Sequence, residues 1–359
     1  MTQTVKYAIV GCGMMGREHM RNLALVEGAR LVAIADPDAG SRERAQLQAE
    51  KLGQDPAITG DTESVADRGD IDAIIVASPN FTHHDLLKRL MDAGPALLVE
   101  KPLCTTVDDA RSIARLAADY PALFWVGLEY RYMPPVARFI ERVHGGETGL
   151  VRMMYIREHR FPFLPKVGDW NRFNRNTGGT LVEKCCHFFD LMRHTLQDEP
   201  VRIFASGAQD VNHLDERYDG EVPDILDNAF VTVDFAGGAR AVLDLCMFAE
   251  GAEQQEEIYA LGAKGRLDVA IPAATVTWSP RDRSGPQIEH VATPPEALQA
   301  GSHHGATFFQ LQRFQQALIG GHEAEVTAID GLRSVEMGAA AQESIACGQA
   351  IALGTSKDT

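Results

Sequence analysis

The sequence predicts an α/β protein in two parts, because the pattern of apolar residues changes along its 359 residues. In residues 1–127, short apolar runs alternate with amphipathic stretches, which is the βαβ pattern of a parallel sheet covered on both faces. After Tyr132, several segments alternate single apolar and polar residues, as antiparallel strands with one packed face do. We therefore expect an α/β domain at 1–127 and an α+β domain at 128–359.

The first part is expected to contain strands joined by helices. The strands are Tyr7–Val10, Leu31–Ala35, Ala73–Ala77, Ala96–Val99 and Leu123–Gly127. The helices lie near Met15–Val26, Ser41–Leu52, His84–Ala93 and Val107–Asp119. Because a helix between two strands makes them parallel, the carboxyl ends of these strands meet at one edge of the sheet, where open α/β sheets bind ligands.

The second part is expected to contain an antiparallel hairpin, formed by Val231–Phe235 and Ala241–Leu245 with a turn at Gly237-Gly238. Other expected strands are Val151–Ile156, Val201–Ala205, Glu256–Leu261 and Ala274–Trp278. Helices are expected after Gly178-Gly179, at His304–Leu318 and at Ile329–Ile351. The segment Arg281–Gln299 is rich in proline and charge, which indicates a surface loop.

The composition is that of a globular protein with an acidic surface. A net charge of −16 disfavours nucleic acid and anionic membranes as partners, since both need a positive surface. The first residues show no apolar signal region, and no stretch has the length of a membrane span. The 6 cysteines show neither disulfide-framework spacing nor a zinc signature. We expect a cytoplasmic protein of a reducing compartment, with no bound metal.

A glycine-rich turn follows the first strand and predicts a dinucleotide site. Gly11, Gly13 and Gly16 fit the pattern G-x-G-x-x-G, with a strand before them and a helix after them. The first glycine permits a tight turn, the second lets the backbone approach a pyrophosphate, and the third allows the helix to pack closely on the strand. Met14 and Met15 open that helix, whose N-terminus supplies hydrogen-bond donors to the phosphates.

Asp36 ends the next strand, where dinucleotide sites carry an acid. Its carboxylate is expected to accept hydrogen bonds from the adenosine ribose and to repel a 2′-phosphate, which favours NAD. Arg42 lies near enough in sequence to bind a 2′-phosphate, so NADP stays an alternative. Ser78 and Asn80 follow a later strand and are expected to contact the cofactor, with helix capping as the alternative for Asn80.

Lys101 follows the apolar strand Ala96–Val99 and precedes Pro102. At the carboxyl end of a parallel strand it would reach the ligand-binding edge of the sheet, and partial burial makes an ammonium a strong donor to a substrate oxygen. The proline restricts Lys101 to an extended backbone, which fixes the direction of its side chain. An exposed turn is the alternative for a Lys-Pro pair. The nucleotide turn at the same sheet edge favours the functional interpretation.

A second set of reactive side chains follows Gly178-Gly179. On one helix, Glu183 and His187 stand four residues apart and face the same side. The histidine can exchange a proton with a hydroxyl near neutral pH, and the carboxylate can orient it. The alternative is an ordinary helix with a hydrogen-bonded histidine. Zinc is not expected at Cys185-Cys186-His187, because three successive helical residues cannot converge on one ion.

The polar and aromatic stretch Lys166–Asn174 is the expected sugar pocket. Sugars bind through many hydrogen bonds, with an apolar ring face against an aromatic side chain. The candidate residues are Asp169, Trp170, Asn171 and Arg172. An ordered surface loop is the alternative.

Together these motifs resemble those of the Gfo/Idh/MocA oxidoreductases. The resemblance rests on the glycine turn, Ser78-Pro79-Asn80 with His83, Glu100-Lys101-Pro102, Arg131, the stretch from Gly178-Gly179 to His187, and Ile329–Glu336. It implies an N-terminal Rossmann domain and a C-terminal α+β domain with a large open, mostly antiparallel sheet that binds substrate and makes oligomer contacts. It also implies that the cofactor site includes His83, Glu100, Lys101 and Arg131.

The resemblance further implies a reaction, the NAD(P)-dependent oxidation of a ring hydroxyl in a sugar, anhydrosugar or inositol-like polyol. Lys101 would polarise the reacting hydroxyl and His187 would take its proton, so that these residues and Glu183 contact the substrate. Members of the family commonly carry aspartate where this chain has Glu183. The longer side chain changes either substrate placement or the coupling to His187, and it argues against assuming plain myo-inositol as the substrate.

Other functions share this fold. One is a non-catalytic NAD-binding sensor or assembly protein, although Lys101, Glu183 and His187 together favour an enzyme. Another is a redox-assisted glycosidase or an imine reductase. For the enzyme we expect a small-molecule sugar or polyol as the partner, and a homodimer or homotetramer formed through the C-terminal sheet.

Overall fold

The computed structural model describes residues 3–354, which group into two compact units. Unit 1 comprises the chain up to Tyr132, Lys166–Trp170 and Thr293–Val335. Unit 2 comprises Met133–Pro165, Asn171–Ala292 and the chain from Glu336 onward. Each unit is therefore built from separate segments of the chain, and the expected domain boundary between residues 127 and 128 stays a prediction.

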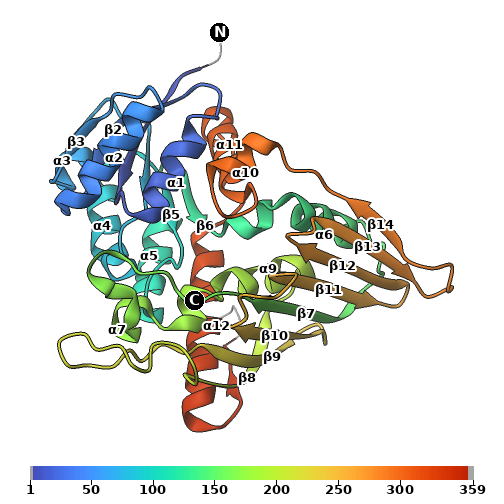
Figure 1. Ribbon diagram of the computed structural model, residues 1–359. Coiled ribbons are helices and arrows are strands. Elements are labelled where there is room, and N and C mark those ends of the chain that lie inside the picture. Colours follow the sequence, from blue (N-terminus) through green and yellow to red (C-terminus); the bar gives the residue numbers. More distant parts are fainter. Residues whose placement is uncertain (1–2, 355–359) are drawn as a thin grey trace. The chain divides into compact units, whose positions relative to one another are not determined.

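Unit 1 contains a 6-stranded parallel sheet in the order β3-β2-β1-β4-β5-β6. Its strands are β1 Val5–Val10, β2 Ala29–Ala35, β3 Ala57–Thr59, β4 Ala73–Val76, β5 Ala96–Glu100 and β6 Phe124–Gly127 (Figure 1). The order reverses between β1 and β4, and this is the switch point at which doubly wound sheets bind dinucleotides. The expected parallel sheet is confirmed. Strand β3 was not predicted, because a segment of three partly exposed residues is too short to form an apolar run.

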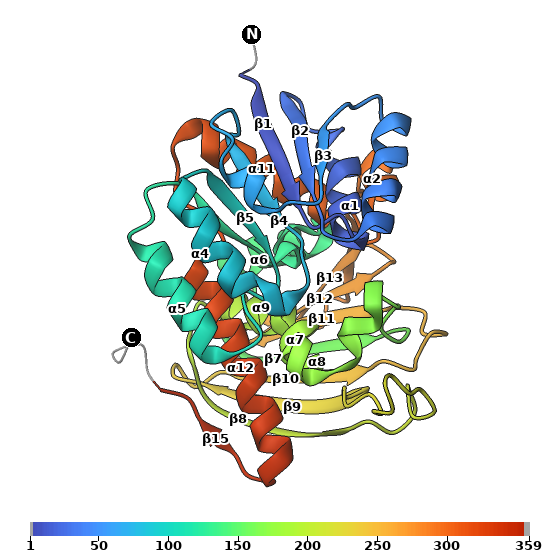
Figure 2. The same cartoon turned by 90° about the vertical axis from the view of Figure 1, so that its left-hand side faces the viewer.

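Helices cover both faces of this sheet. They are α1 Met14–Leu23, α2 Ala39–Lys51, α3 Glu63–Ala66, α4 His83–Ala93, α5 Val107–Ala118, α10 Pro295–Ala300 and α11 Ala306–Gly320, with the 3₁₀ turns η1 Asn80–Thr82 and η2 Glu129–Tyr132. Figure 2 shows α1 and α2 on one side of the strands and α4 and α5 on the other. As a result β4 is completely buried, as a doubly covered parallel strand must be.

The segment Thr293–Val335 belongs to unit 1 because buried polar contacts attach it to α1. The carboxylate of Glu18 lies 2.7 Å from His303 Nδ1 and accepts a hydrogen bond of 2.9 Å from Thr307 Oγ1. Burial alone would raise the pKa of Glu18, but these two neighbours hold it at about 2. The prediction of a surface loop at 281–299 is wrong, because β14 and α10 form within this segment. Proline is favoured in the first turn of a helix, so the prolines there begin α10 instead of interrupting regular structure.

Unit 2 contains a 9-stranded open sheet in the order β14-β13-β12-β11-β7-β10-β9-β8-β15. Its strands are β7 Val151–His159, β8 Pro200–Ala208, β9 Asn228–Phe235, β10 Arg240–Cys246, β11 Glu256–Gly262, β12 Gly265–Ile271, β13 Thr275–Pro280, β14 Gln287–His290 and β15 Ile351–Ala352. Neighbours are antiparallel except for β7 and β10, so the expected mostly antiparallel sheet is confirmed. The predicted hairpin is the pair β9 and β10.

Helices cover one face of this sheet, where Figure 1 shows α6 and α9. The helices are α6 Pro134–His144, α7 Asn174–Thr177, α8 Thr180–Glu183, α9 Cys186–Leu196 and, from Glu336 on, the end of α12 Ala328–Cys347. Along β7 the residues alternate accordingly: Met154 and Ile156 are buried beneath the helices, while Met153 points outward and is exposed.

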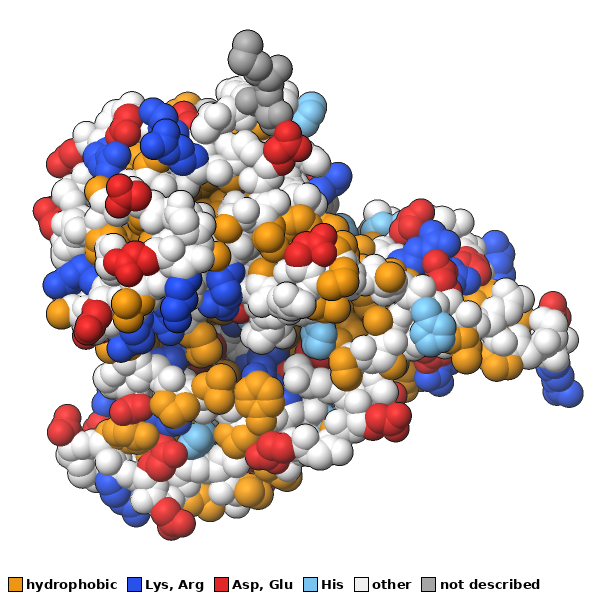
Figure 3. Space-filling model, turned by 45° about the horizontal axis from the view of Figure 1, so that its top comes forward, with side chains coloured by type: hydrophobic (Ala, Val, Ile, Leu, Met, Phe, Trp, Pro, Cys, Tyr) orange, Lys and Arg blue, Asp and Glu red, His pale blue; other side chains and the backbone are white. Residues whose placement is uncertain are grey.

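On the face in Figure 3, acidic and basic side chains are both present over the surface. Between residues 3 and 354, no helix combines the length and the apolar character needed to cross a membrane.

Candidate active site

The turn after β1 packs against the backbone that follows β4, and only glycine fits this approach. Gly11 has φ +89°, and a Cβ there would lie 2.5 Å from the carbonyl carbon of Ala77. A Cβ on Gly16 would lie 2.0 Å from the carbonyl oxygen of Gly11. At Gly13, by contrast, a Cβ would meet no atom within 4 Å. The first and third glycines therefore shape the turn, and the second leaves open space for a ligand.

Helix α1 begins at this turn with backbone donors that its own side chains do not cap. Gly13 makes no side-chain cap and the first turn carries no acid, whereas Asp38 caps α2 and Thr106 caps α5. The first N–H groups of a helix lack intrahelical partners, and the helix dipole favours an anion there. The open space at Gly13 and these donors fit the pyrophosphate of a dinucleotide.

Asp36 directly follows β2 and is oriented by the glycine turn. Its Oδ2 accepts a hydrogen bond of 2.7 Å from the backbone N–H of Cys12, and its Oδ1 accepts one of 2.8 Å from that of Asp38. Arg42 Nη1 donates to the carbonyl oxygens of Asp36 and Pro37, at 2.7 and 2.8 Å. The arginine that could have bound a 2′-phosphate is thus engaged with the backbone, which favours NAD.

Asn80 and His83 follow β4 and differ in what they offer. Asn80 is 5% exposed, and its Nδ2 has no hydrogen-bond partner among residues 3–354, so this amide is a donor suited to a cofactor. His83 is completely buried, with Nδ1 2.9 Å from the carbonyl oxygen of Pro102 and Nε2 3.2 Å from that of Ser78. Burial lowers the pKa of His83, so the neutral ring donates through one nitrogen, to one of these two carbonyl oxygens.

Lys101 stands half-buried at the carboxyl end of β5, above a buried acid that sequence reasoning assigned to the cofactor. That acid, Glu100, points inward and lies 2.6 Å from His19 Nε2. Burial opposes ionisation of Glu100, but the hydrogen bond with His19 and its charge hold the pKa of Glu100 below its ordinary value. Glu100 therefore carries the negative charge that a neighbouring ammonium requires.

Glu129 is a functional candidate that sequence reasoning missed. It is 1% exposed in η2, and burial together with the Glu100 carboxylate raises the pKa of Glu129 to about 7. The positive charges of His303 and Lys101 act in the opposite direction and lower the pKa of Glu129. Glu129 follows β6 by two residues, so the strand-end argument that identified Lys101 would have found it.

Arg131 is buried within unit 1. Its Nη1 donates to the carbonyl oxygen of Glu325 at 2.8 Å, and its Nη2 lies 3.4 Å from Asp330 Oδ1. These contacts join η2 to the start of α12. The expected contact of Arg131 with the cofactor stays a prediction.

In unit 2, Glu183 and His187 do not lie on one continuous helix, and that premise of the sequence argument was wrong. Helix α8 ends at Glu183 and α9 begins at Cys186. The hydrogen-bond ladder changes between them, since Phe188 and Phe189 both donate to the carbonyl oxygen of Cys185. Both reactive side chains are 2% exposed. The propensities of these residues give no signal for the break, which coincides with a tertiary contact of Lys184.

The four candidate sugar-binding residues belong to different units. Asp169 and Trp170 lie in η3 Val167–Arg172 and group with unit 1, where the Trp170 ring packs edge-on against Phe81 and beneath Lys166 Nζ at 4.4 Å. Asn171 and Arg172 group with unit 2 and are buried. Their roles as sugar ligands stay predictions.

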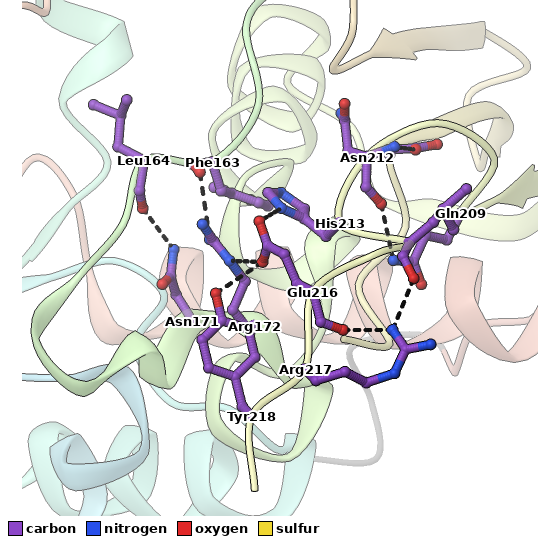
Figure 4. A network of polar contacts seen from close by, with 12 residues as sticks. Phe163, Leu164, Asn171, Arg172, Gln209, Asn212, His213, Glu216, Arg217 and Tyr218 are labelled. Atoms are coloured by element: carbon purple, nitrogen blue, oxygen red, sulfur yellow. Dashed lines mark hydrogen bonds and ion pairs between the residues drawn. The ribbon is translucent and has the colours of Figure 1, made fainter. Parts of the chain in front are cut away.

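Figure 4 shows that Asn171 and Arg172 are held by a polar network in unit 2. Asn171 Nδ2 donates to the carbonyl oxygen of Leu164 at 3.0 Å, and Arg172 Nε donates to Glu216 Oε2 at 2.9 Å. Glu216 also contacts His213 Nδ1 and accepts from the Tyr218 hydroxyl, both at 2.8 Å. Burial opposes ionisation, but these donors hold the pKa of Glu216 below its ordinary value. The long loop between β8 and β9 thus fixes Arg172 through one carboxylate, while Asn171 is held by the backbone of Leu164.

Comparisons with known proteins extend over almost the whole chain. Residues 5–128 match the family model described as oxidoreductase family, NAD-binding Rossmann fold, and residues 140–353 match the model described as oxidoreductase family, C-terminal alpha/beta domain. The chain is 27% identical to the scyllo-inositol 2-dehydrogenase (NAD(+)) of Bacillus subtilis, over 98% of this chain and 97% of that protein. It is 29% identical to the inositol 2-dehydrogenase of Rhizobium meliloti, over 76% and 79% of the two chains.

Among solved structures, levoglucosan dehydrogenase in complex with NADH superposes with a TM-score of 0.86. The superposition covers 98% of this chain and 100% of that one, at 20% identity. At this identity the likeness shows the fold.

Replacing Asp36 with alanine is expected to weaken NAD⁺ binding about tenfold or more, because a charge-assisted hydrogen bond to the ribose is lost. Discrimination against NADP⁺ should relax as the negative charge disappears. Calorimetric titration of both cofactors measures the two dissociation constants. Asp38→Ala is the control, since it removes the cap of α2 and an exposed ion pair with Arg44, and it should leave the ratio of the two dissociation constants unchanged. An unchanged ratio in Asp36→Ala would contradict the assignment.

Replacing Glu216 with glutamine is expected to lower stability by about 1–2 kcal/mol, because the buried Arg172 guanidinium loses its charged partner. The matched control is Glu221→Gln, in the same loop, where the pair with Arg175 is exposed and should be worth less than about 0.5 kcal/mol. Chemical denaturation measures both free energies of unfolding. Equal losses in the two variants would show that the network does not hold this segment.

Proposed function

The chain belongs to the Gfo/Idh/MocA family of oxidoreductases and carries its NAD-binding Rossmann domain, and on that premise we propose that it oxidises a ring hydroxyl of a cyclic polyol or sugar. The observation that carries the proposal is the position of Lys101. It stands at the carboxyl end of β5, on the sheet edge where the glycine turn of β1 offers its donors. An ammonium there acts on a substrate oxygen beside the cofactor.

Bound NAD⁺ would supply the hydride acceptor. Lys101 donates a hydrogen bond to the reacting hydroxyl and stabilises the negative charge that develops on its oxygen. The buried carboxylate of Glu100 favours the charged form of the lysine, and Glu129 places a second carboxyl group in the same field. The lysine is thereby held as an electrostatic partner rather than as a base.

His187 is proposed to accept the hydroxyl proton on an imidazole nitrogen. Its support is its burial in the first turn of α9 and the presence of Glu183, a buried carboxylate at the end of α8. Glu183 would orient the substrate or the imidazole, and its extra methylene relative to aspartate alters that contact. Trp170 and Asp169 are proposed to meet the ring face and its hydroxyls.

The proposed substrate class is supported by the names of the relatives, which are inositol 2-dehydrogenases. The test is a panel of inositols, sugars and anhydrosugars with NAD⁺ and NADP⁺, followed by nicotinamide absorbance. The proposal expects turnover of at least one cyclic polyol or sugar with NAD⁺. A panel with no turnover, in a protein that binds NAD⁺, would favour a non-catalytic sensor instead.

Replacing Lys101 with methionine is expected to lower kcat by about a hundredfold or more while leaving NAD⁺ affinity nearly unchanged, since the charge acts on the developing oxyanion. Lys88→Met, an exposed lysine of α4, is the control and should keep wild-type rates. His187→Gln should also lower kcat by about 10²-fold or more, with a residual rate that rises with pH as hydroxide replaces the base. Near wild-type turnover in Lys101→Met would overturn the mechanism.

The proposal includes a homo-oligomer formed through the outward face of the unit 2 sheet. Phe230 and Met153 are exposed on that face by 63% and 58%, and Tyr155 stacks on Tyr259 between neighbouring strands. Apolar side chains gathered on one sheet face mark an interaction site. Light scattering should give the mass of a dimer or tetramer, and Phe230→Glu should lower it. A monomer at micromolar concentration would contradict this part of the proposal.

A further inference from the structure

Two glutamates face each other on the helix-covered side of the unit 2 sheet. Glu158 of β7 and Glu256 of β11 are register partners, and Cβ atoms of such partners lie about 4.5–5.5 Å apart. Glu158 is completely buried and Glu256 is 1% exposed. The next register pair, Arg157 and Glu257, lies on the other face and forms an ordinary ion pair of 2.5 Å. Two negative charges opposite each other would destabilise the sheet, so the inner pair needs another arrangement.

Lys184 reaches this pair from the bend between α8 and α9. Its Nζ lies 2.9 Å from Glu158 Oε1, and its side chain is 4% exposed. Arg160 Nη1 lies 3.5 Å from the same oxygen. Glu256 Oε1 instead accepts a neutral amide hydrogen bond of 2.7 Å from Gln255 Nε2. The cations therefore bind Glu158, and Glu256 is left in an environment suited to an uncharged acid.

Each glutamate has a second carboxylate oxygen that these cations and amides do not reach. Glu158 Oε2 and Glu256 Oε2 are both buried, and neither has a hydrogen-bond partner in the described part of the chain, residues 3–354. A single proton between the two carboxyl groups turns one oxygen into a donor and satisfies both. In agreement, burial and the neighbouring Glu158 carboxylate raise the pKa of Glu256 to about 8.

We propose that Glu158 and Glu256 share one proton and, with Lys184, form a buried anchor that positions the bend carrying Glu183 and His187. Glu158, Glu256 and Lys184 are positioning residues, because they act on the reaction only by holding the bend in place. Lys184 directly follows Glu183, and its ammonium fixes the chain to β7 at the point where the helical ladder changes. The positioning role rests on the proposed function, whereas the shared proton does not.

The shared proton has a consequence for stability. Glu256 keeps its proton in the folded protein up to about pH 8, while its ordinary pKa is 4.5. Between these values the folded state binds more protons than the unfolded state, so the stabilisation is complete below pH 4.5 and is lost as the pH rises towards 8. The charged groups that face Glu256 in this window are Glu158 from β7 and Lys184 from the bend, with Arg160 behind Glu158.

Melting temperatures measured from about pH 5 to pH 9 test the shared proton, with the substitutions Glu256→Gln and Glu257→Gln. Glutamine imitates a protonated glutamate at every pH, so Glu256→Gln should flatten the decline of the melting temperature with rising pH. Glu257→Gln changes the next residue, whose ion pair lies on the other face, and should keep the wild-type decline. A decline in Glu256→Gln equal to that of the wild type would overturn the shared proton.

Steady-state kinetics on the polyol identified by the panel test the positioning role. Lys184→Met should lower kcat about tenfold or more with NAD⁺ affinity unchanged, whereas the conservative Glu256→Gln should keep kcat near neutral pH. If Lys184→Met does not fold, Glu256→Leu replaces it and should also lower kcat, because Glu158 Oε2 loses its donor. Wild-type kcat in whichever of these disruptive variants is measured would overturn the positioning role. A wild-type protein with no polyol activity would refute the proposed function, and the melting temperatures would still decide the shared proton.

Discussion

The burial of carboxylates close to the candidate site residues of both units is the constraint on which the rest of this structure depends. A carboxylate removed from water needs a cation, a donor or a proton of its own. Glu18 has His303 and Thr307, Glu100 has His19, and Glu158 has Lys184. Each partner comes from an element distant in sequence. The buried carboxylates are therefore compensated only when these distant elements pack together, so packing and charge compensation occur in the same step.

This constraint explains why two Glu-Lys pairs in the chain behave differently. In Glu100-Lys101 the glutamate turns inward to His19, and the lysine remains half-buried at the sheet edge. In Glu183-Lys184 the lysine turns inward to Glu158. In the mechanism we propose, the first arrangement presents an ammonium to the substrate, and the second uses one to hold the backbone beside His187. The same dipeptide thus turns its glutamate inward in one unit and its lysine inward in the other.

The sequence predicted the parts of the site that depend on local pattern and topology. The glycine turn, Asp36 and Lys101 were identified because strand ends and glycine spacing determine where they lie, and the parallel sheet order bears this out. The break between α8 and α9 was not predicted, since it coincides with a contact of Lys184 to a strand twenty-six residues earlier. The hydrogen bond from Arg172 to Glu216 joins residues that are 44 positions apart, so no local sequence pattern predicts it.

The central claim is that a carbon-bound hydrogen passes from a cyclic polyol to the nicotinamide while Lys101 stabilises the negative charge that develops on the reacting oxygen. The most direct measurement uses a substrate deuterated at the reacting carbon, with mass spectrometry of the nicotinamide product under single-turnover conditions. The account predicts that deuterium appears in the reduced nicotinamide at the rate of turnover, and that this transfer is slowed in Lys101→Met at saturating NAD⁺. Turnover without deuterium in the nicotinamide, or transfer at an unchanged rate in the variant, would contradict it.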